Sequence, residues 1–527
     1  MHRIWNIDEL LAFIIQGLVS IKDRAYMART CRNFYELAMD ILWQDIRDIN
    51  ILWHCFPPHI WRKDHLGRIR FVQPPQAEDW AQLLRNGARV KSFTCCFFLD
   101  AEEVFQMLKY TYPGAHVLPN VRSLQIVLDP GIAQFAPWFM GPRLVHLSLP
   151  EPLLPLAKDT LSRLLDDVPT TLKTLDISSF SIASKAMGSS YDVDVLSKIT
   201  HLVELDIRIY PHADVLFFVA SLPKLRNLRL LVLKGGMHIT VPQDDAPTFQ
   251  SLESLEVLSP VLLSDPTMLS PPVSPRWLPR LLKLIPNHRL RSLVVGYPFS
   301  SPDAILPLAL ALHMQRRLRK LEIHPTAKYR KSTLVPEDLI AAFDALMTLK
   351  EIRFFVVPGY VGYYATNDTL SRLSQSWPNL EELDLGPQAI YSNPQEPTLV
   401  GLHALAHGCP SLRKVAICVY LSTSQDFPCS SQCLSSDRGG ILFNVKKWQI
   451  NGNWELLANF LERVFPGTNI TIESAERTTE ADGWNMIISK IPRMKVRRKE
   501  LSSANFLEDD ISYNISPKYA LFADISF

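Results

Sequence analysis

Residues 377 to 385 read Trp377-Pro378-Asn379-Leu380-Glu381-Glu382-Leu383-Asp384-Leu385. The three leucines occupy positions one, four and six of the pattern L-x-x-L-x-L. Between positions three and six apolar and acidic residues alternate, which is the period of two expected of a strand with one buried face. Pro378 stops an incoming helix and favours an extended entry. The stretch therefore predicts a short strand with buried leucines and exposed acidic side chains.

The same pattern recurs along the middle of the chain. The other clear copies are Val121-Leu124-Ile126, Leu144-Leu147-Leu149, Leu172-Leu175-Ile177, Leu202-Leu205-Ile207, Leu225-Leu228-Leu230, Leu252-Leu255-Val257, Leu290-Leu293-Val295, Leu318-Leu321-Ile323, Leu349-Ile352-Phe354 and Leu412-Val415-Ile417. Weaker copies are Val90-Phe93-Cys95 and Val445-Trp448-Ile450. Twelve steps thus cover the 355 residues between 90 and 445, or about 30 residues per step.

Between these strands the spacing of apolar residues becomes helical. Examples are Leu339, Phe343 and Leu346, then Leu399, Leu402 and Leu405, and the face formed by Leu456, Leu457, Phe460, Leu461 and Val464. One strand plus one helix per unit of about 30 residues is the leucine-rich-repeat pattern, in which stacked units bury what one unit cannot. An ordinary parallel α/β sheet also alternates strands and helices, but the fixed frame favours the solenoid. We therefore predict an α/β solenoid, a leucine-rich-repeat horseshoe of strand-plus-helix units.

The N-terminus predicts a separate small helical module. We expect three helices, over residues 8–18, 23–29 and 32–46. Leu10, Leu11, Ile14 and Leu18 form one stripe of the first helix, and Asp8 can cap it. A module of about 45 residues builds only a marginal core. It is therefore expected to need a partner or a docked neighbour.

This segment resembles an F-box. The matching residues are Ile7-Asp8-Glu9-Leu10-Leu11, Ile14, Leu18, Ala28-Arg29-Thr30-Cys31-Arg32-Asn33-Phe34 and Leu42-Trp43. Cys31 and Arg32 stand at the family's Cys-basic pair, and Phe34 and Trp43 stand at its two Trp positions. Asp8 replaces the family's Pro, which helps to form the adaptor-binding edge. The repeats beginning at Trp377 and at Gly408-Cys409-Pro410 are likewise similar to the irregular, cysteine-containing repeats of F-box proteins, although most copies lack the Asn or Cys after the last leucine.

The resemblance implies a substrate receptor of a Skp–cullin–F-box ubiquitin ligase. In that family the F-box docks a Skp-type adaptor, and through it a cullin, while the repeats bind a protein substrate. The adaptor-binding residues implied here are Ile7, Leu10, Leu11, Ile14, Cys31, Phe34 and Trp43. The alternative is that these residues only pack the three-helix bundle. Because so small a bundle cannot bury all of them, we favour an interface.

Substrate contact is expected on the concave strand face, as in solenoids generally. Outward positions three, five and seven of the frame give the candidate substrate-binding residues Asp176, Glu204, Asp206, Arg208, Arg229, Arg353, Phe355, Glu382 and Asp384. The alternative is a merely solvated strand surface. The face is mixed in charge with an acidic lean, and the pair Glu204 and Asp206 favours a basic segment of the substrate.

Charge and hydropathy exclude several classes of protein. The chain has 55 basic and 53 acidic residues, a net charge of +2, which argues against a nucleic-acid binder. Its eight cysteines are too few and too irregular for a disulfide scaffold. The longest apolar run after the N-terminus, residues 305–312, is too short to span a membrane. The run at residues 10–18 lacks a basic leader, so we expect a cytoplasmic or nuclear protein without a signal peptide.

No catalytic motif stands out in the sequence. Phosphate-binding loops, dinucleotide fingerprints and nucleophile elbows are missing, so we expect no enzyme and no cofactor. His403 and His407 are spaced to share a metal, with Cys409 beyond, but the surrounding leucines indicate a structural helix. Cys429 and Cys433 lie in a Ser-rich insertion at residues 422–440 and are not expected to bind zinc.

The predicted organisation has four parts. Residues 1–48 form the F-box-like module, 49–85 a Pro- and Trp-rich connector that caps the first repeat, 86–475 the solenoid and 476–527 the C-terminal segment and tail. The basic cluster at residues 493–499 is either a nuclear address or a solvated segment. A repeat scaffold that is not coupled to ubiquitin transfer remains the alternative function.

Overall fold

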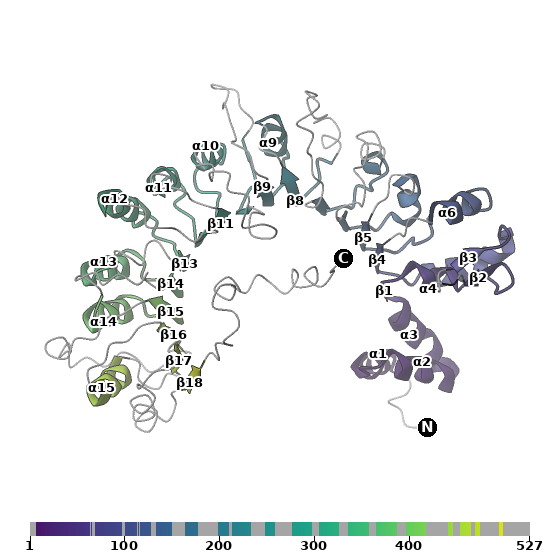
Figure 1. Ribbon diagram of the computed structural model, residues 1–527, viewed down its shortest axis with the longest axis horizontal. Coiled ribbons are helices and arrows are strands. Elements are labelled where there is room, and N and C mark those ends of the chain that lie inside the picture. Colours follow the sequence, from purple (N-terminus) through teal and green to yellow (C-terminus); the bar gives the residue numbers. More distant parts are fainter. Residues whose placement is uncertain are drawn as a thin grey trace. The chain divides into compact units, whose positions relative to one another are not determined.

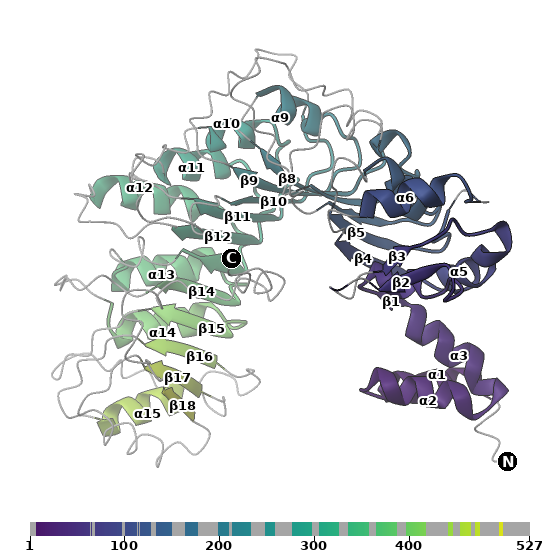
Figure 2. The same cartoon turned by 45° about the vertical axis from the view of Figure 1, so that its right-hand side comes forward.

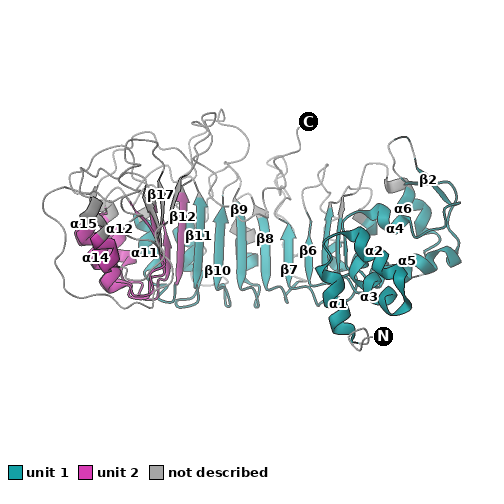
Figure 3. Cartoon of the chain, turned by 90° about the horizontal axis from the view of Figure 1, so that it is seen from below, with its two compact units in different colours: residues 1–318, 325–333 teal, residues 319–324, 334–527 magenta. Residues whose placement is uncertain are grey.

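The computed structural model describes residues 7–63, 65, 69–96, 101–112, 114, 116–127, 133–149, 164–177, 199–209, 213–232, 248–258, 277–297, 305–325, 336–357, 365–386, 397–417, 441–445, 454–464, 470–474 and 495–498. The chain divides into two compact units, which Figure 3 colours separately. Unit 1 comprises Met1–Leu318 and Pro325–Thr333, and unit 2 comprises Arg319–His324 and Leu334–Phe527.

Three helices open unit 1, as the sequence predicts. They are α1 (Asp8–Gly17), α2 (Ile21–Thr30) and α3 (Arg32–Trp43) (Figure 1). Their small core consists of Ile15, Ala28 and Ala38, against which Phe34, Leu37 and Ile41 pack. Asp8 does not cap α1, because Ile7 is the N-cap and makes no side-chain hydrogen bond. Asp8 instead begins the helix, where its negative charge complements the helix dipole.

The connector is folded onto the first end of the repeat sheet. Strand β1 (Asp45–Ile46) follows α3 and pairs in parallel with β4 (Ser92–Cys96). The chain then forms α4 (Ile49–Trp53), the hairpin of β2 (Trp61–Lys63) and β3 (Ile69–Phe71), the short 3-10 helix η2 (Ala77–Asp79) and α5 (Trp80–Gly87).

Aromatic rings attach this connector to the first repeat. The ring centroids of Trp53 and Phe105 are 5.7 Å apart, and those of Trp80 and Tyr112 are 4.9 Å apart. These contacts place Trp53 and Trp80 of the predicted connector, residues 49–85, against the first repeat. The predicted start of the solenoid at residue 86 is too late, because β1 is already part of the sheet.

The repeats of unit 1 form a parallel sheet in chain order. Its further strands are β5 (Ser123–Val127), β6 (His146–Ser148), β7 (Thr174–Ile177), β8 (Glu204–Ile209), β9 (Asn227–Val232), β10 (Ser254–Leu258) and β11 (Ser292–Tyr297). The intervening helical segments are α6 (Ala101–Lys109), η3 (Ala133–Phe139), α9 (Ala213–Ala220), α10 (Leu278–Lys283) and α11 (Ile305–Leu312). Figure 2 shows helices such as α9 and α10 on one side of the strands, which leaves the other side of each strand open.

Strand register explains why the frame repeats. The residues at position four pair across neighbouring strands in one continuous row: Phe93, Leu124, Leu147, Leu175, Leu205, Leu228, Leu255 and Leu293. All eight are buried. Burying a side chain of this size stabilises the fold by about 1.5–3 kcal/mol relative to leaving it in water. A strand that slipped by one residue would turn this row to solvent.

Unit 2 repeats the same arrangement. Its strands are β12 (Lys320–Pro325), β13 (Phe354–Val356), β14 (Glu382–Gly386), β15 (Lys414–Ile417), β16 (Ile441–Val445), β17 (Ile470–Ser474) and β18 (Lys495–Arg498). Its helices are α12 (Pro336–Leu346), α13 (Asn367–Ser376), α14 (Leu399–Gly408) and α15 (Trp454–Val464). The strand-plus-helix solenoid predicted from the leucine pattern is therefore present in both units.

Three details of the predicted frame are wrong in unit 2. Phe355, not Phe354, pairs with Leu383 and occupies the buried position of β13. The strand that pairs with β15 is β16, in which Phe443 stands opposite Val415, so Val445 does not begin the next copy; Trp448 and Ile450 lie outside the described residues. The sheet also continues past residue 475, because β18 pairs with β17 in parallel. Part of the basic cluster at residues 493–499 is thus a strand.

Candidate protein-binding surfaces

An apolar surface is exposed along α1. Ile7, Leu10 and Ile14 are 43%, 42% and 38% exposed. Their spacing places them on one side of the helix. Phe13, which the sequence analysis did not single out, is 75% exposed beside them. We call Ile7, Leu10, Phe13 and Ile14 the α1 apolar surface; exposed apolar surface of this kind marks interaction sites in soluble proteins.

The remaining predicted adaptor-binding residues differ in exposure. Leu11 is only 1% exposed, so it is a core residue of the module and cannot contact a partner in this conformation. Cys31 is exposed, whereas Phe34 and Trp43 are half-buried. Phe34 packs against the module core. Helix α1 therefore turns Leu11 and Ile15 inward, and the predicted stripe of Leu10, Leu11, Ile14 and Leu18 is not the buried face.

Two further exposed apolar residues lie at the start of α2: Val19 precedes its N-cap, and Ile21 is its first residue. Val19 is 96% exposed and Ile21 is 72% exposed. They flank Ser20, whose hydroxyl caps α2 by accepting a hydrogen bond from the Lys22 N–H at 3.2 Å. Two β-branched apolar residues around a capping serine are the sequence signal that could have identified this turn.

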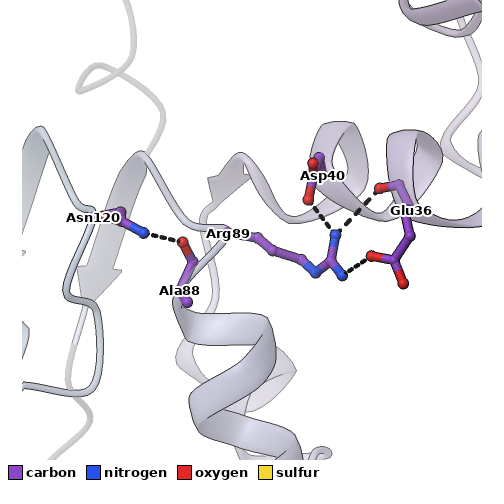
Figure 4. A network of polar contacts seen from close by, with 5 residues as sticks. All are labelled: Glu36, Asp40, Ala88, Arg89 and Asn120. Carbon is purple, nitrogen blue, oxygen red and sulfur yellow. Dashed lines mark hydrogen bonds and ion pairs between the residues drawn. The ribbon is translucent and has the colours of Figure 1, made fainter. Parts of the chain in front are cut away.

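Arg89 joins the helical module to the repeats. Its guanidinium binds the carboxylates of Glu36 and Asp40 on α3, and its Nη1 also donates to the Glu36 carbonyl at 3.2 Å (Figure 4). Next to it, the Asn120 amide donates to the Ala88 carbonyl at 2.7 Å. Partial burial lowers the pKa of Arg89, but the two carboxylates outweigh it and raise that pKa above its ordinary value. The module is therefore held on unit 1 by ionic contacts as well as by β1.

The open strand face of unit 1 carries a cluster of acidic side chains. Asp176, Asp206, Arg229 and Glu256 occupy position five of four successive strands, β7 to β10. Arg229 Nη1 lies 3.1 Å from Asp206 Oδ2, and its Nε lies 3.3 Å from Glu256 Oε1. Ser148 on β6 extends this row by donating to Asp176 at 2.9 Å. One arginine is thus shared between two carboxylates, Asp206 and Glu256.

Position three of the same strands adds a second polar row. Glu204 accepts hydrogen bonds from Thr174 at 3.2 Å and from Asn227 at 2.8 Å. Thr174 and Asn227 were not among the predicted residues, since neither carries a charge. Arg208 lies in β8, where its backbone pairs with Leu231. The structure therefore brings Asp176, Glu204, Asp206 and Arg229 together on one face, as predicted.

Asp206 is the electrostatically unusual member of this face. Burial, together with the nearby carboxylates of Asp176 and Glu256, outweighs the attraction of Arg229 and raises the pKa of Asp206 from 3.8 to about 6. Its Oδ1 is buried and accepts no hydrogen bond from the described residues. The face therefore holds a negative charge that the fold itself does not fully neutralise.

The strand face of unit 2 is more evenly charged. Glu322 lies 3.0 Å from Lys320 Nζ and 3.3 Å from His324 Nε2. Burial would raise the pKa of Glu322, but these two neighbours lower it overall. Lys414 Nζ lies 2.5 Å from Glu382 Oε1. The predicted residues Glu382 and Asp384 are thus both on this face. Glu382 is paired with Lys414, and Asp384 lies two residues further along β14.

The prediction of Phe355 as a substrate-binding residue is wrong, and Arg353 occupies a different position of the frame from the one predicted. Phe355 is fully buried and packs against the Trp377 ring at a centroid distance of 4.7 Å. Arg353 precedes β13, outside the outward strand positions, and its Nη1 lies 3.5 Å from Glu381 Oε1. Both errors come from the frame slip at residue 354. The positions of β13 that pair with Glu382 and Asp384 are instead Phe354, which is half-buried, and Val356, which is buried.

The candidate metal ligands on α14 do not converge. The ring centroids of His403 and His407 are 6.4 Å apart. Cys409 is buried, and its thiol donates to the Trp377 carbonyl at 3.4 Å. Burial, and secondarily His407, lowers the pKa of His403. Within the described ranges no three His, Cys, Asp or Glu side chains gather as a metal site. Cys429 and Cys433 lie outside the described residues.

Among the helices in the described part of the chain, none is both long and apolar enough to cross a bilayer.

Comparison with known proteins finds solved structures at low identity and low TM-score. No family model and no curated protein matches the sequence. An internalin (inlF) from Listeria monocytogenes has 11% identity and a TM-score of 0.34, over 86% of this chain and 93% of that one. An LRR protein from Leptospira interrogans has 11% identity and a TM-score of 0.36, over 79% and 92%. The structure of the Rad7 and Elc1 complex in yeast gives 15% identity and a TM-score of 0.32, over 74% and 92%. The fold assignment itself rests on the strand register and burial described above.

Proposed function

We propose that this chain is the non-catalytic substrate receptor of a Skp–cullin–F-box ubiquitin ligase. The N-terminal module binds a Skp-type adaptor, which recruits a cullin, and the strand face of the repeats binds a protein substrate. The observation that carries the proposal is the α1 apolar surface. Three of its members, Ile7, Leu10 and Ile14, are among the seven residues for which the F-box resemblance implies adaptor contact, and all three are exposed.

The attachment of the helical module to the repeats through Arg89 supports the same function. A receptor has to hold its substrate at a defined distance from the ligase. Here α3 leads within two residues into β1, and β1 is hydrogen-bonded into the sheet. The salt bridges of Arg89 add a second attachment. The module is therefore not a domain on a free linker.

The strand face of unit 1 gives the proposed substrate a chemical class. Four acidic side chains, Asp176, Glu204, Asp206 and Glu256, lie at positions three and five of β7 to β10, where Arg229 is the one base. A segment rich in Lys or Arg would contribute the positive charge that Asp206 and its neighbours lack. Because such a segment occurs in both cytoplasmic and nuclear proteins, the proposed location of the receptor is either compartment.

Co-purification tests the two halves separately. A tagged full-length chain should bring down the Skp adaptor and a cullin, and Leu10→Asp with Ile14→Asp should abolish both without affecting captured substrate. Glu204→Lys with Asp206→Lys should release the substrate and keep the adaptor. Tyr110→Asp, an exposed aromatic position after α6, is the control for both. Substrate capture without adaptor or cullin would instead identify a repeat scaffold that is not coupled to ubiquitin transfer.

A further inference from the structure

The amino ends of the unit 1 strands form a second polar surface, distinct from the strand face. Strands β6 to β11 run in one direction, so their first residues lie along one edge (Figure 3). Backbone hydrogen bonds stack the residues at position two of successive repeats. In the series Lys91, Arg122, Val145, Lys173, Val203 and Arg226, each N–H from Arg122 onward donates to the carbonyl of the preceding member at 2.8 Å. Neighbours in this series are therefore about 4.8 Å apart, the spacing of paired strands.

This edge concentrates positive charge in a chain that is otherwise balanced. We define the basic edge as Lys91, Arg122, Arg143, Lys173, Lys224 and Arg226, where Arg143 and Lys224 precede the first buried leucine of their repeats. All six are exposed. Within the described ranges, no carboxylate forms an ion pair with any of them. The whole chain has 55 basic and 53 acidic residues, so this edge is a local separation of charge.

The corresponding edge of unit 2 is partly neutralised. Arg319 lies 3.2 Å from Glu351, and Arg353 lies 3.5 Å from Glu381. Position two of the β15 repeat is Arg413, which forms no ion pair among the described residues, so the continuous run of such bases is a feature of unit 1. In unit 1 the only acidic member of the position-two row is Glu253, and it faces Arg291 at 3.4 Å, beyond the basic edge.

We propose that the basic edge binds an extended acidic segment of a partner protein. The five strand steps from Lys91 to Arg226 cover about 24 Å, which seven or eight residues of extended peptide span at about 3.3 Å each. Val145 and Val203 are half-buried between the bases, so the fitting segment has apolar residues among its acids. The edge offers no aromatic side chain at these positions for base stacking, which favours a peptide over a nucleic acid.

The two surfaces of unit 1 select opposite charges. The strand face repels an acidic segment through Asp176, Glu204 and Asp206, whereas the basic edge attracts it. The proposal therefore adds a second, independent partner site and does not depend on adaptor binding or on the identity of the substrate.

Fluorescence anisotropy with the full-length chain tests the site. The probe is a labelled peptide of repeated Glu-Glu-Val triplets about twelve residues long, compared with a Lys-Lys-Val peptide and an oligothymidine. Binding of the acidic peptide should weaken steeply as ionic strength rises from about 0.05 to about 0.5 M. Lys173→Glu with Arg226→Glu should weaken it about tenfold or more. Arg62→Glu with Lys63→Glu, exposed bases on β2, should leave it unchanged.

Three results would overturn the proposal. The first is equal affinity for the acidic and basic peptides. The second is that the β2 control variant loses as much affinity for the acidic peptide as Lys173→Glu with Arg226→Glu. The third is that oligothymidine binds as tightly as the acidic peptide and loses the same affinity in Lys173→Glu with Arg226→Glu. Circular dichroism melting of each variant separates a lost site from a lost fold. If Lys173→Glu with Arg226→Glu unfolds the chain, the milder Lys173→Gln with Arg226→Gln replaces it, with a smaller loss expected in the same direction.

Discussion

Arg89 binds Asp40 across 49 residues of sequence and so links the last helix of the N-terminal module to the turn that begins the repeats. Its side chain is 14% exposed, while those of Asp40 and Glu36 are 59% and 66% exposed. The bridge is thus anchored on the repeat side and open to water on the module side, where solvent screens it.

Arg89→Ala should loosen the module without unfolding the repeats. Because the carboxylates are largely exposed, we expect a loss of only about 1 kcal/mol. Amide hydrogen exchange should become faster in α3 and stay unchanged in β5 to β10. Arg62→Ala on β2 is the matched control. Unchanged exchange in α3 would mean that β1 alone holds the module.

The buried position of β13 can be tested by a pair of substitutions. Phe355→Ala should cost about 3–5 kcal/mol, since it opens a cavity beside Trp377 and Phe343. Phe354→Ala should cost about 1 kcal/mol or less, because the Phe354 side chain is half-exposed. Urea unfolding measures both. Equal costs, or a larger cost at Phe354, would contradict the register of β13 with β14.

The raised pKa of Asp206 predicts a pH-dependent stability. In the unfolded chain this carboxyl ionises near 3.8, and in the folded chain at about 6. The neutral form is therefore favoured by folding, so the charge destabilises the protein increasingly as pH rises from about 4 to 6 and fully above that. Asp206→Asn should raise the Tm at pH 7 and have little effect at pH 4.

Thermal melts at several pH values provide the measurement for Asp206. Asp23→Asn, an exposed position on α2, controls for a simple change of net charge. A Tm difference for Asp206→Asn that does not change between pH 4 and pH 7 would refute the assigned environment.

Asn367 connects two neighbouring helices of unit 2. Its Oδ1 accepts from the Thr398 N–H at 2.8 Å and the Gly401 N–H at 3.0 Å, and its Nδ2 donates to Thr398 Oγ1 at 3.0 Å. It therefore caps α14 from α13. Asn367→Ala should cost about 1–3 kcal/mol. Asn367→Asp should recover most of this, because the carboxylate keeps the acceptor and suits a helix N-terminus. Asn379→Ala, in an exposed turn, should be nearly neutral in the same unfolding assay.

The sequence was sufficient for the fold wherever the apolar pattern was unambiguous. Leu380, Leu383 and Leu385 are separated by polar residues, so only one alternation of inward and outward positions buries all three. All three are buried in the structure. At residues 352–357 the chain reads Ile-Arg-Phe-Phe-Val-Val, and an almost continuous apolar run does not fix the phase. The pairing of Phe355 with Leu383 determines which residues of β13 face the core, and these two residues are distant in sequence.

Other features depend on contacts that sequence spacing does not encode. Strand β18 has a single apolar residue, Val496, so its place beside β17 could not be anticipated from hydropathy. The pairing of Arg89 with Glu36 and Asp40 likewise joins distant segments. Within α1, all six residues at positions 10 to 15 are apolar and leave more than one plausible buried face. The core of Ile15, Ala28 and Ala38 determines which face is buried.

Binding of the purified full-length chain to the purified Skp adaptor of the same organism tests the central claim most directly. Isothermal titration calorimetry should give saturable binding for the wild type and for Tyr110→Asp, and no binding for Leu10→Asp with Ile14→Asp that still melts cooperatively. Absence of binding by the wild type, under conditions where an established F-box protein binds the same adaptor, would contradict the proposed receptor function.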